Sequence, residues 1–173
     1  MAGRKAENVE LKGYYPGVVG KIIQLHAEYY FEKWGFDVSF ETQEGKELSE
    51  FIRDFHESRD GFWVAQIRGI FAGSIAIDGR NAETEGARLR WLIVEPEFQG
   101  QGIGSLLVKE AVQFCKKADY NQVYLWTFEG LDTARYVYEQ EGFRLTRERR
   151  LKQWGQDINE QMFQLSWESR ARE

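Results

Sequence analysis

One stretch in the middle of the chain limits its fold more than any other. Residues 88–94 are apolar enough, and rich enough in β-branched and aromatic side chains, to predict a strand, which Pro96 ends because proline cannot continue a hydrogen-bond ladder. A glycine-rich turn, residues 99–104, follows. Apolar positions then repeat at intervals of three and four down to about Ala118, which predicts a helix, and residues 123–128 predict another strand. This strand-turn-helix-strand order indicates a mixed α/β sheet.

The flanking segments predict more elements of the same kind. Val9 to Tyr15 is an imperfectly alternating strand, the apolar positions from Ile22 to Trp34 mark a helix that Gly35 ends, and Glu47 to His56 is a second helix. Further strands are expected at 62–67, 70–77, 143–151 and 162–167, and a short helix at 133–140. We therefore expect one domain over residues 1–173, of class α/β (α+β), with helices on both faces of the sheet.

Composition narrows the setting and the partners. The chain has 173 residues, 42% of them hydrophobic, which suffices for one core, and its formal charge of -5 offers no overall positive field for nucleic acid or an anionic membrane. Cys115 is the only cysteine, and the first residues lack the apolar run of a signal peptide, so we expect a cytoplasmic protein without disulfides. No window is apolar for long enough to cross a bilayer. The sequence leaves the oligomeric state open, a homodimer included.

The turn at residues 99–104 is the segment that indicates chemistry. Glycines at a helix start let successive N–H groups point at one anion such as a diphosphate, although glycines that only relieve crowding explain the turn equally well. A Walker loop requires Lys and then Ser or Thr after its last glycine, whereas Gly104 is followed by Ser105 and Leu106. A dinucleotide-binding turn requires a third glycine three residues after the second, and Leu107 occupies that place. Neither of these alternatives fits.

What remains resembles the GNAT superfamily of acetyl-coenzyme A-dependent acyltransferases. Its signature is Gln or Arg, any two residues, Gly, any residue, then Gly or Ala, and Gln99, Gly102 and Gly104 match it. The strand ending Leu92-Ile93-Val94-Glu95-Pro96 is similar to the one usual before this turn, and Ala134-x-x-x-Tyr138-x-x-x-Gly142-Phe143 resembles a later motif. The resemblance implies an N-acetyltransferase in which an amine attacks acetyl-coenzyme A directly in a ternary complex, with no metal.

Part of the chain also resembles one subgroup. The segment His26 to Glu41 and the closing strands look like the acetyltransferase half of bacterial MarR/GNAT fusion proteins, which suggests a bacterial enzyme. The superfamily resemblance further implies a centrally splayed sheet, because the strand at 88–94 and the strand at 123–128 must part to admit the thioester.

The resemblance also assigns roles to the coenzyme-binding residues. The strand before the turn pairs its backbone with the pantetheine arm, and the turn holds the pyrophosphate. Tyr138 falls where family members commonly place the tyrosine that protonates the departing thiolate, and Leu131 stands where many members have asparagine. The expected coenzyme-binding residues are Leu92, Ile93, Val94, Gln99, Gly100, Gln101, Gly102, Ile103, Gly104 and Ser105.

The sequence offers several candidates for the base that accepts the proton of the amine. Arg88 and Trp126 occupy places where some relatives carry a base, and neither can act as one. Glu129, just after the strand at 123–128, is the first choice. Glu28, Asp37, Glu41 and a chain of water molecules are the alternatives, and each of these acids could also be a plain solvated side chain.

The acceptor site is predicted from two groups of side chains. Arg88 and Arg90 share strand parity with Leu92, so we expect both to face the thioester, where an arginine can hold an acceptor carboxylate through two parallel hydrogen bonds. Alternatively, both pair with neighbouring acids such as Glu83 or Glu85. An aromatic helix face, which could also be plain core, supplies the other candidates: His26, Tyr30 and Trp34.

Three functions remain open. The first is acetylation of a small amine or amino acid, and the second keeps the coenzyme but acts on a peptide amine, at a protein lysine or N-terminus. The third is a module that senses acetyl-coenzyme A without turnover, because the usual strand positions carry no base.

Overall fold

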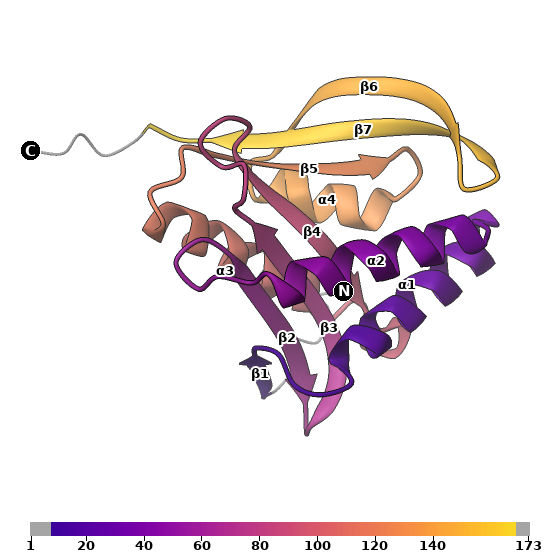
Figure 1. Ribbon diagram of the computed structural model, residues 1–173, viewed down its shortest axis with the longest axis horizontal. Coiled ribbons are helices and arrows are strands. Elements are labelled where there is room, and N and C mark those ends of the chain that lie inside the picture. The colour runs from indigo at the N-terminus through magenta and orange to yellow at the C-terminus, as the bar shows by residue number, and fades with distance from the viewer. Residues whose placement is uncertain (1–7, 169–173) are drawn as a thin grey trace, which may run out of the picture.

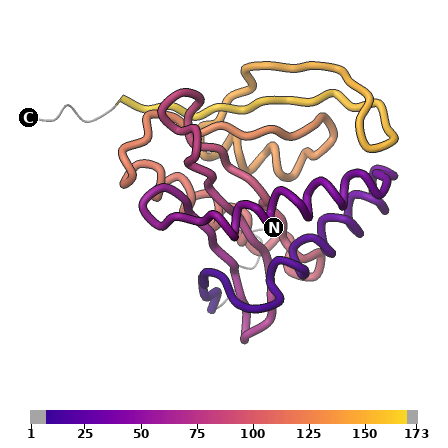
Figure 2. The backbone as a smooth tube through the Cα atoms, viewed as in Figure 1, coloured from indigo at the N-terminus to yellow at the C-terminus, as the bar shows by residue number. Residues whose placement is uncertain are grey.

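A computed structural model describes residues 8–168 of the chain. Seven strands form one sheet in the order β1-β2-β3-β4-β5-β7-β6, in which every neighbouring pair is antiparallel except β4 and β5 (Figures 1 and 2). The elements, in chain order, are β1 Val9–Lys12, α1 Val18–Trp34, α2 Val38–Arg53, β2 Gly61–Ile67, β3 Ile70–Asp78, β4 Ala87–Val94, the short 3-10 helix Pro96–Phe98, α3 Ile103–Lys117, β5 Gln122–Phe128, α4 Asp132–Gln140, β6 Arg144–Gln153 and β7 Gln156–Ser166. The predicted mixed sheet is confirmed.

Helices cover both faces of this sheet. One core lies between the sheet and α3, and includes Leu89, Leu107 and Leu125. On the opposite face, α1 and α2 pack on the sheet through a second core that includes Ile22, Leu48 and Trp91 (Figure 1). A third, aromatic cluster lies at the C-terminal ends of α1 and β5; its members are Phe36, Phe40, Phe128 and Ile158, with Tyr30, Trp34, Leu131, Leu151 and Trp154 packed against them. Among the described residues, no helix has both the length and the apolar character needed to cross a bilayer.

The central strands β4 and β5 part soon after they begin. They pair only at Ala87 with Val123 and at Arg88 with Tyr124, although both strands continue for several residues. Beyond Arg88, the edge of β4 that faces β5 has no ladder partner. The expected splay of the sheet is confirmed.

A bulge in β4 overturns the parity argument for the arginines. Arg90 pairs with Ala76 and Ile93 with Ser74, so Trp91 and Leu92 together oppose one residue of β3. Trp91 has a φ of 51°, and its carbonyl accepts a 2.9 Å hydrogen bond from the Ser74 hydroxyl. The bulge reverses the alternation. Arg88 and Arg90 consequently face the α1–α2 side, whereas Leu92 contributes to the α3-side core.

The beginnings of α2 and β7 differ most from the sequence prediction. Helix α2 begins at Val38, nine residues early, because the Asp37 carboxylate caps it by accepting from the Ser39 N–H at 2.9 Å. Strand β7 begins at Gln156, six residues early, and forms a long hairpin with β6. The hairpin tip reaches α2 (Figure 1), where the Asp37 N–H donates to the Trp154 carbonyl at 3.0 Å. Both corrections place polar residues beside the opening in the sheet.

Candidate active site

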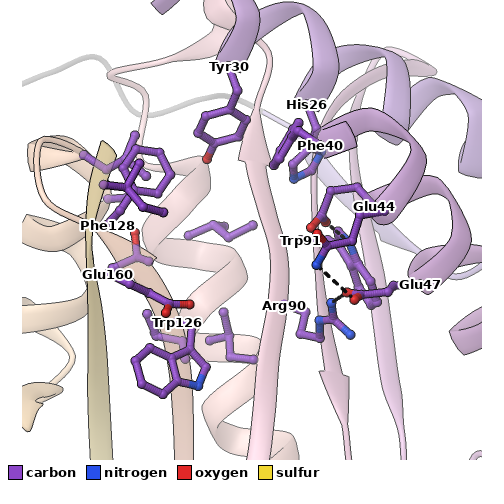
Figure 3. Close-up of a pocket in the computed structure, with 18 of the residues that line it drawn as sticks. His26, Tyr30, Phe40, Glu44, Glu47, Arg90, Trp91, Trp126, Phe128 and Glu160 are labelled. Carbon is purple, nitrogen blue, oxygen red and sulfur yellow. Dashed lines mark hydrogen bonds and ion pairs between the residues drawn. The ribbon is translucent and has the colours of Figure 1, made fainter. Parts of the chain in front are cut away.

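A cavity passes through the sheet where β4 and β5 part. Leu92, Leu125 and Tyr138 line it from the α3–α4 side. From the α1–α2 side the walls are aromatic and charged, and Figure 3 shows α2 and β4 on one side and β5 and β7 on the other. We call this second part the chamber; its lining includes His26, Tyr30, Phe40, Glu44, Glu47, Arg88, Arg90, Trp126, Phe128, Trp154 and Glu160. Two molecules can therefore meet in the opening from opposite faces of the sheet.

The glycine-rich turn lies at the start of α3, next to the end of β4. Gly100 and Gly102 have φ values of 76° and 84°, and a side chain added at either would meet no atom within 4 Å, so the outer side of the turn is open. The side-chain amide of Gln99 donates a 3.2 Å hydrogen bond to the Val94 carbonyl and so links the turn to the end of the strand. The first hydrogen bond of α3 runs from the Leu106 N–H to the Gly102 carbonyl, so the amides before Leu106 have no partner within the helix. An open turn with free amides fits a diphosphate.

Tyr138 lies on α4 and lines the cavity. Its ring packs against Phe143 and Phe163, with centroids 5.8 Å and 6.3 Å away, and only 6% of the residue is exposed. Burial raises the pKa of the phenol well above its usual value, so the hydroxyl keeps its proton at neutral pH.

His26 and Tyr30, two of the residues predicted for the acceptor site, line the chamber. His26 Nδ1 lies 2.8 Å from the Ile22 carbonyl, and because a carbonyl only accepts, Nδ1 carries the hydrogen and Nε2 keeps its lone pair. Burial lowers the pKa of His26 to about 4, so the ring is neutral at physiological pH. Trp34, the third residue predicted for the acceptor site, lies outside the cavity. It packs edge-on against Phe128, with ring centroids 5.1 Å apart.

Two glutamates of α2, which the sequence prediction missed, point into the chamber (Figure 3). The Glu44 carboxylate accepts a 2.7 Å hydrogen bond from the Trp91 indole, and burial raises the pKa of Glu44 despite the nearby charge of Arg90. Glu47 forms an ion pair with Arg90. Burial acts to raise the pKa of Glu47, but the Arg90 charge and hydrogen bonds outweigh it, so that this pKa is lowered. The spacing of Gln43, Glu44 and Glu47 on one helix face is the signal that could have found them.

The two arginines of β4 differ in their partners. Arg90 pairs with Glu47, and its guanidinium lies over the Trp91 ring at 4.1 Å. Arg88 has no hydrogen-bond or ion-pair partner among residues 8–168, and its Nε is completely buried. Burial, aided by the charge of Arg90, lowers the pKa of Arg88. Neither arginine pairs with Glu85, which accepts instead from the Tyr124 hydroxyl at 3.3 Å.

A sequence model of the acetyltransferase (GNAT) family matches residues 20–143, more than half of the chain. The chain belongs to the GNAT family. An uncharacterised N-acetyltransferase of Methanocaldococcus jannaschii is 29% identical over 67% of this GNAT chain and 54% of its own length. The N-acetylaspartate synthetase of Danio rerio is 32% identical over 48% of this chain and 29% of its own. The chain thus spans about half of the first relative and less than a third of the second.

Solved GNAT structures share the fold. The putative acetyltransferase yncA of Salmonella typhimurium, solved with acetyl-CoA, superposes with a TM-score of 0.76 at 11% identity and covers 96% of this chain and 98% of its own. A putative phosphinothricin N-acetyltransferase gives a TM-score of 0.72 at 15% identity, over 94% of this chain and 100% of its own. At such identities the likeness shows the fold alone.

The base predicted for this GNAT chain requires correction. Glu129 is exposed and does not line the cavity; its N–H donates to the Asn159 carbonyl at 2.8 Å, toward the β6–β7 hairpin. The alternatives Glu28, Asp37 and Glu41 are also exposed and outside the lining. The acids that reach the cavity come from α2 and β7 instead.

Proposed function

We propose that this chain transfers the acetyl group of acetyl-CoA to the primary amine of a small acceptor that also carries a carboxylate, as an amino acid does. The main support for a carboxylate-bearing acceptor is the guanidinium of Arg88, which lines the cavity and has no partner in the described part of the chain. A buried charge without a partner is expensive, and a carboxylate that receives two parallel N–H bonds from it would remove that penalty. The name of one relative, N-acetylaspartate synthetase, agrees with an amino-acid acceptor.

The α3 side of the opening suits the coenzyme, which when bound supplies a thioester carbonyl activated toward amines. The free amides at Gly102, Ile103 and Gly104 would hold its diphosphate. The unpaired edge of β4, from Leu92 to Val94, offers backbone donors and acceptors to the pantetheine arm, as an added strand would use them. Tyr138, kept protonated by burial, would donate a hydrogen bond to the sulfur that departs.

The chamber side suits the acceptor and its proton. Glu44 is our candidate base, because it lines the chamber and burial raises its pKa. A general base works best when its pKa is close to the pH of the reaction. The Trp91 indole engages one of its oxygens, Oε2, and leaves Oε1 for an amine. Glu47 neutralises Arg90, so that Arg88 remains the guanidinium available for a carboxylate.

An amine panel tests the acceptor class. Release of free thiol from acetyl-CoA should be fastest with amino acids and much slower with the matching amines that lack the carboxylate. Arg88→Gln should lower kcat/KM for amino acids by about 10- to 150-fold, the value of hydrogen bonds to a charged group. Arg80→Gln is the matched control, because Arg80 pairs with Asp78 outside the cavity.

Two results would count against this function. One is a panel in which amines without a carboxylate are the best acceptors and Arg88→Gln leaves their ranking unchanged. The other is tight coenzyme binding with no amine that speeds thiol release, which would favour the sensing module. A melting curve of each variant separates loss of acceptor binding from loss of the fold.

A further inference from the structure

One face of the β6–β7 hairpin leads from the chamber to the protein surface. Gln153 of β6 lines the cavity and Leu151 packs in the aromatic cluster, so alternate residues of β6 point to the chamber side. Continuing outward with the same parity, Arg149 and Arg147 lie on this face. The outer rim of the chamber is therefore cationic.

Both arginines lie over Trp126, a chamber-lining residue of β5. The guanidinium carbon of Arg149 is 4.9 Å from the centroid of the Trp126 ring, and that of Arg147 is 5.8 Å away. The register of the strands explains the contact between Arg147 and Trp126. Trp126 is paired with Met162 of β7, and Met162 is paired with Arg147 of β6. The ring and the arginine thus share one row across the sheet, on the wall that faces Arg90 and Glu47 in Figure 3.

The two rim arginines differ in charge balance. Arg149 Nε lies 2.5 Å from Glu160 Oε2, a carboxylate that also lines the cavity. Arg147 has no ion-pair or hydrogen-bond partner within residues 8–168 and is exposed. Its five N–H donors, apart from the ring contact, are free for an anion.

The sheet register relates the row of Arg147 to the row of Arg88. Arg88 is paired in register with Tyr124, and Trp126 is two residues further along the same face of β5, about 7 Å away at the usual strand rise. Arg88 and Arg147 thus lie in neighbouring rows of the sheet but on opposite walls of the chamber, with β5 and β7 between their strands.

We propose that Arg147, stacked on Trp126, binds a second anionic group of the acceptor, so that the preferred acceptor is an amino acid with a carboxylate in its side chain. This inference rests on the proposed function and refines its substrate class. Arg88 holds the first carboxylate in the depth of the chamber, and Arg147 holds the second at the rim. Neutral side chains of the same shape leave Arg147 without a partner.

Acid and amide pairs of equal shape test the second subsite. Wild-type protein should show kcat/KM for aspartate or glutamate at least ten-fold above that for asparagine or glutamine. Arg147→Gln should bring this ratio to between one and two, and should weaken aspartate binding to the coenzyme-loaded protein about ten-fold by calorimetry. Arg150→Gln, on the same strand but without contact to Trp126, should leave the ratio as it is in the wild type.

The outcomes separate the two proposals. If acids and amides are acetylated equally well, or if Arg147→Gln leaves a large ratio in place, the second subsite is refuted while the acceptor class stands. If no amino acid is acetylated at all, the acceptor class fails, and the second subsite fails with it. Equal loss of the ratio in Arg147→Gln and Arg150→Gln would also refute the subsite, because it would indicate a general effect of charge.

Discussion

Glu44 lies 2.7 Å from the Trp91 indole in a chamber whose other charged groups are mostly paired. Burial favours the neutral form of its carboxyl and raises the pKa. A free amine must lose a proton when it is acetylated, and a carboxylate of higher pKa accepts that proton more readily. As the proposed base, this single side chain would set the acidic limb of the pH dependence.

We expect the acidic limb of the kcat/KM profile to lie above the ordinary glutamate pKa of about 4.3, because Glu44 loses its proton only at higher pH. Glu44→Gln should remove this limb and lower kcat by about 10²- to 10⁴-fold. Glu129→Gln serves as the control, since Glu129 is exposed outside the cavity and its loss should change kcat less than about two-fold. A profile that is unchanged in Glu44→Gln would assign the base elsewhere.

At the scale of elements, the sequence predicts each helix and strand that packs in a core but misses the beginnings of α2 and β7. Helix α1 and its Gly35 cap follow from regular apolar spacing, and the cap indeed has a φ of 69°. The first turns of α2 were missed because Gln43 and Glu44 face a polar chamber, so apolar periodicity is weak there. The start of β7 was missed because Gln156 and Asp157 are both polar and exposed, so no apolar alternation marks the strand there.

The bulge at Trp91 shows a second limit of sequence reasoning. Apolar and polar residues alternate from Ala87 to Arg90 and residues 91–94 are all apolar, so nothing in the pattern marks a large aromatic residue with positive φ. Tertiary contacts hold this conformation, through the Ser74 hydroxyl and the Glu44 carboxylate. The family motifs predict a coenzyme-binding turn and a role for Tyr138, whereas the face on which Arg88 and Arg90 lie depends on this one local reversal.

The tip of the β6–β7 hairpin offers a test at the same scale. Trp154 packs on Phe36 and Phe40, with centroids 4.9 Å and 5.0 Å away, and its indole donates to Gln43 at 3.0 Å. Trp154→Ala should lower the unfolding free energy by about 3 kcal/mol and raise KM for the acceptor more than KM for acetyl-CoA, because it removes part of the chamber wall.

Trp167→Ala is the comparison for the hairpin variant. Trp167 follows the opposite end of β7, near Lys116, and lies outside the chamber. Its replacement should destabilise the protein without changing KM for the acceptor. If both variants raise this KM alike, the hairpin tip has no special part in holding the acceptor.

At the scale of the whole molecule, the sheet separates the α3 side, with its open turn, from the chamber on the α1–α2 side. Coenzyme binding should stabilise the native state by about 2.7 kcal/mol at a concentration 100 times its Kd. In a chain of this size that corresponds to a rise in Tm of about 5–10 °C. Adenosine, which lacks the diphosphate, should shift Tm by less than about 1 °C. Absence of a shift with acetyl-CoA would refute the assignment of the turn.

The early parting of β4 and β5 has a practical consequence for redesign. In the proposed reaction, donor and acceptor enter the cavity from opposite sides of the sheet. Changes confined to the inward faces of α2 and β6 should therefore retune which amine is used while the affinity for the donor stays as it was.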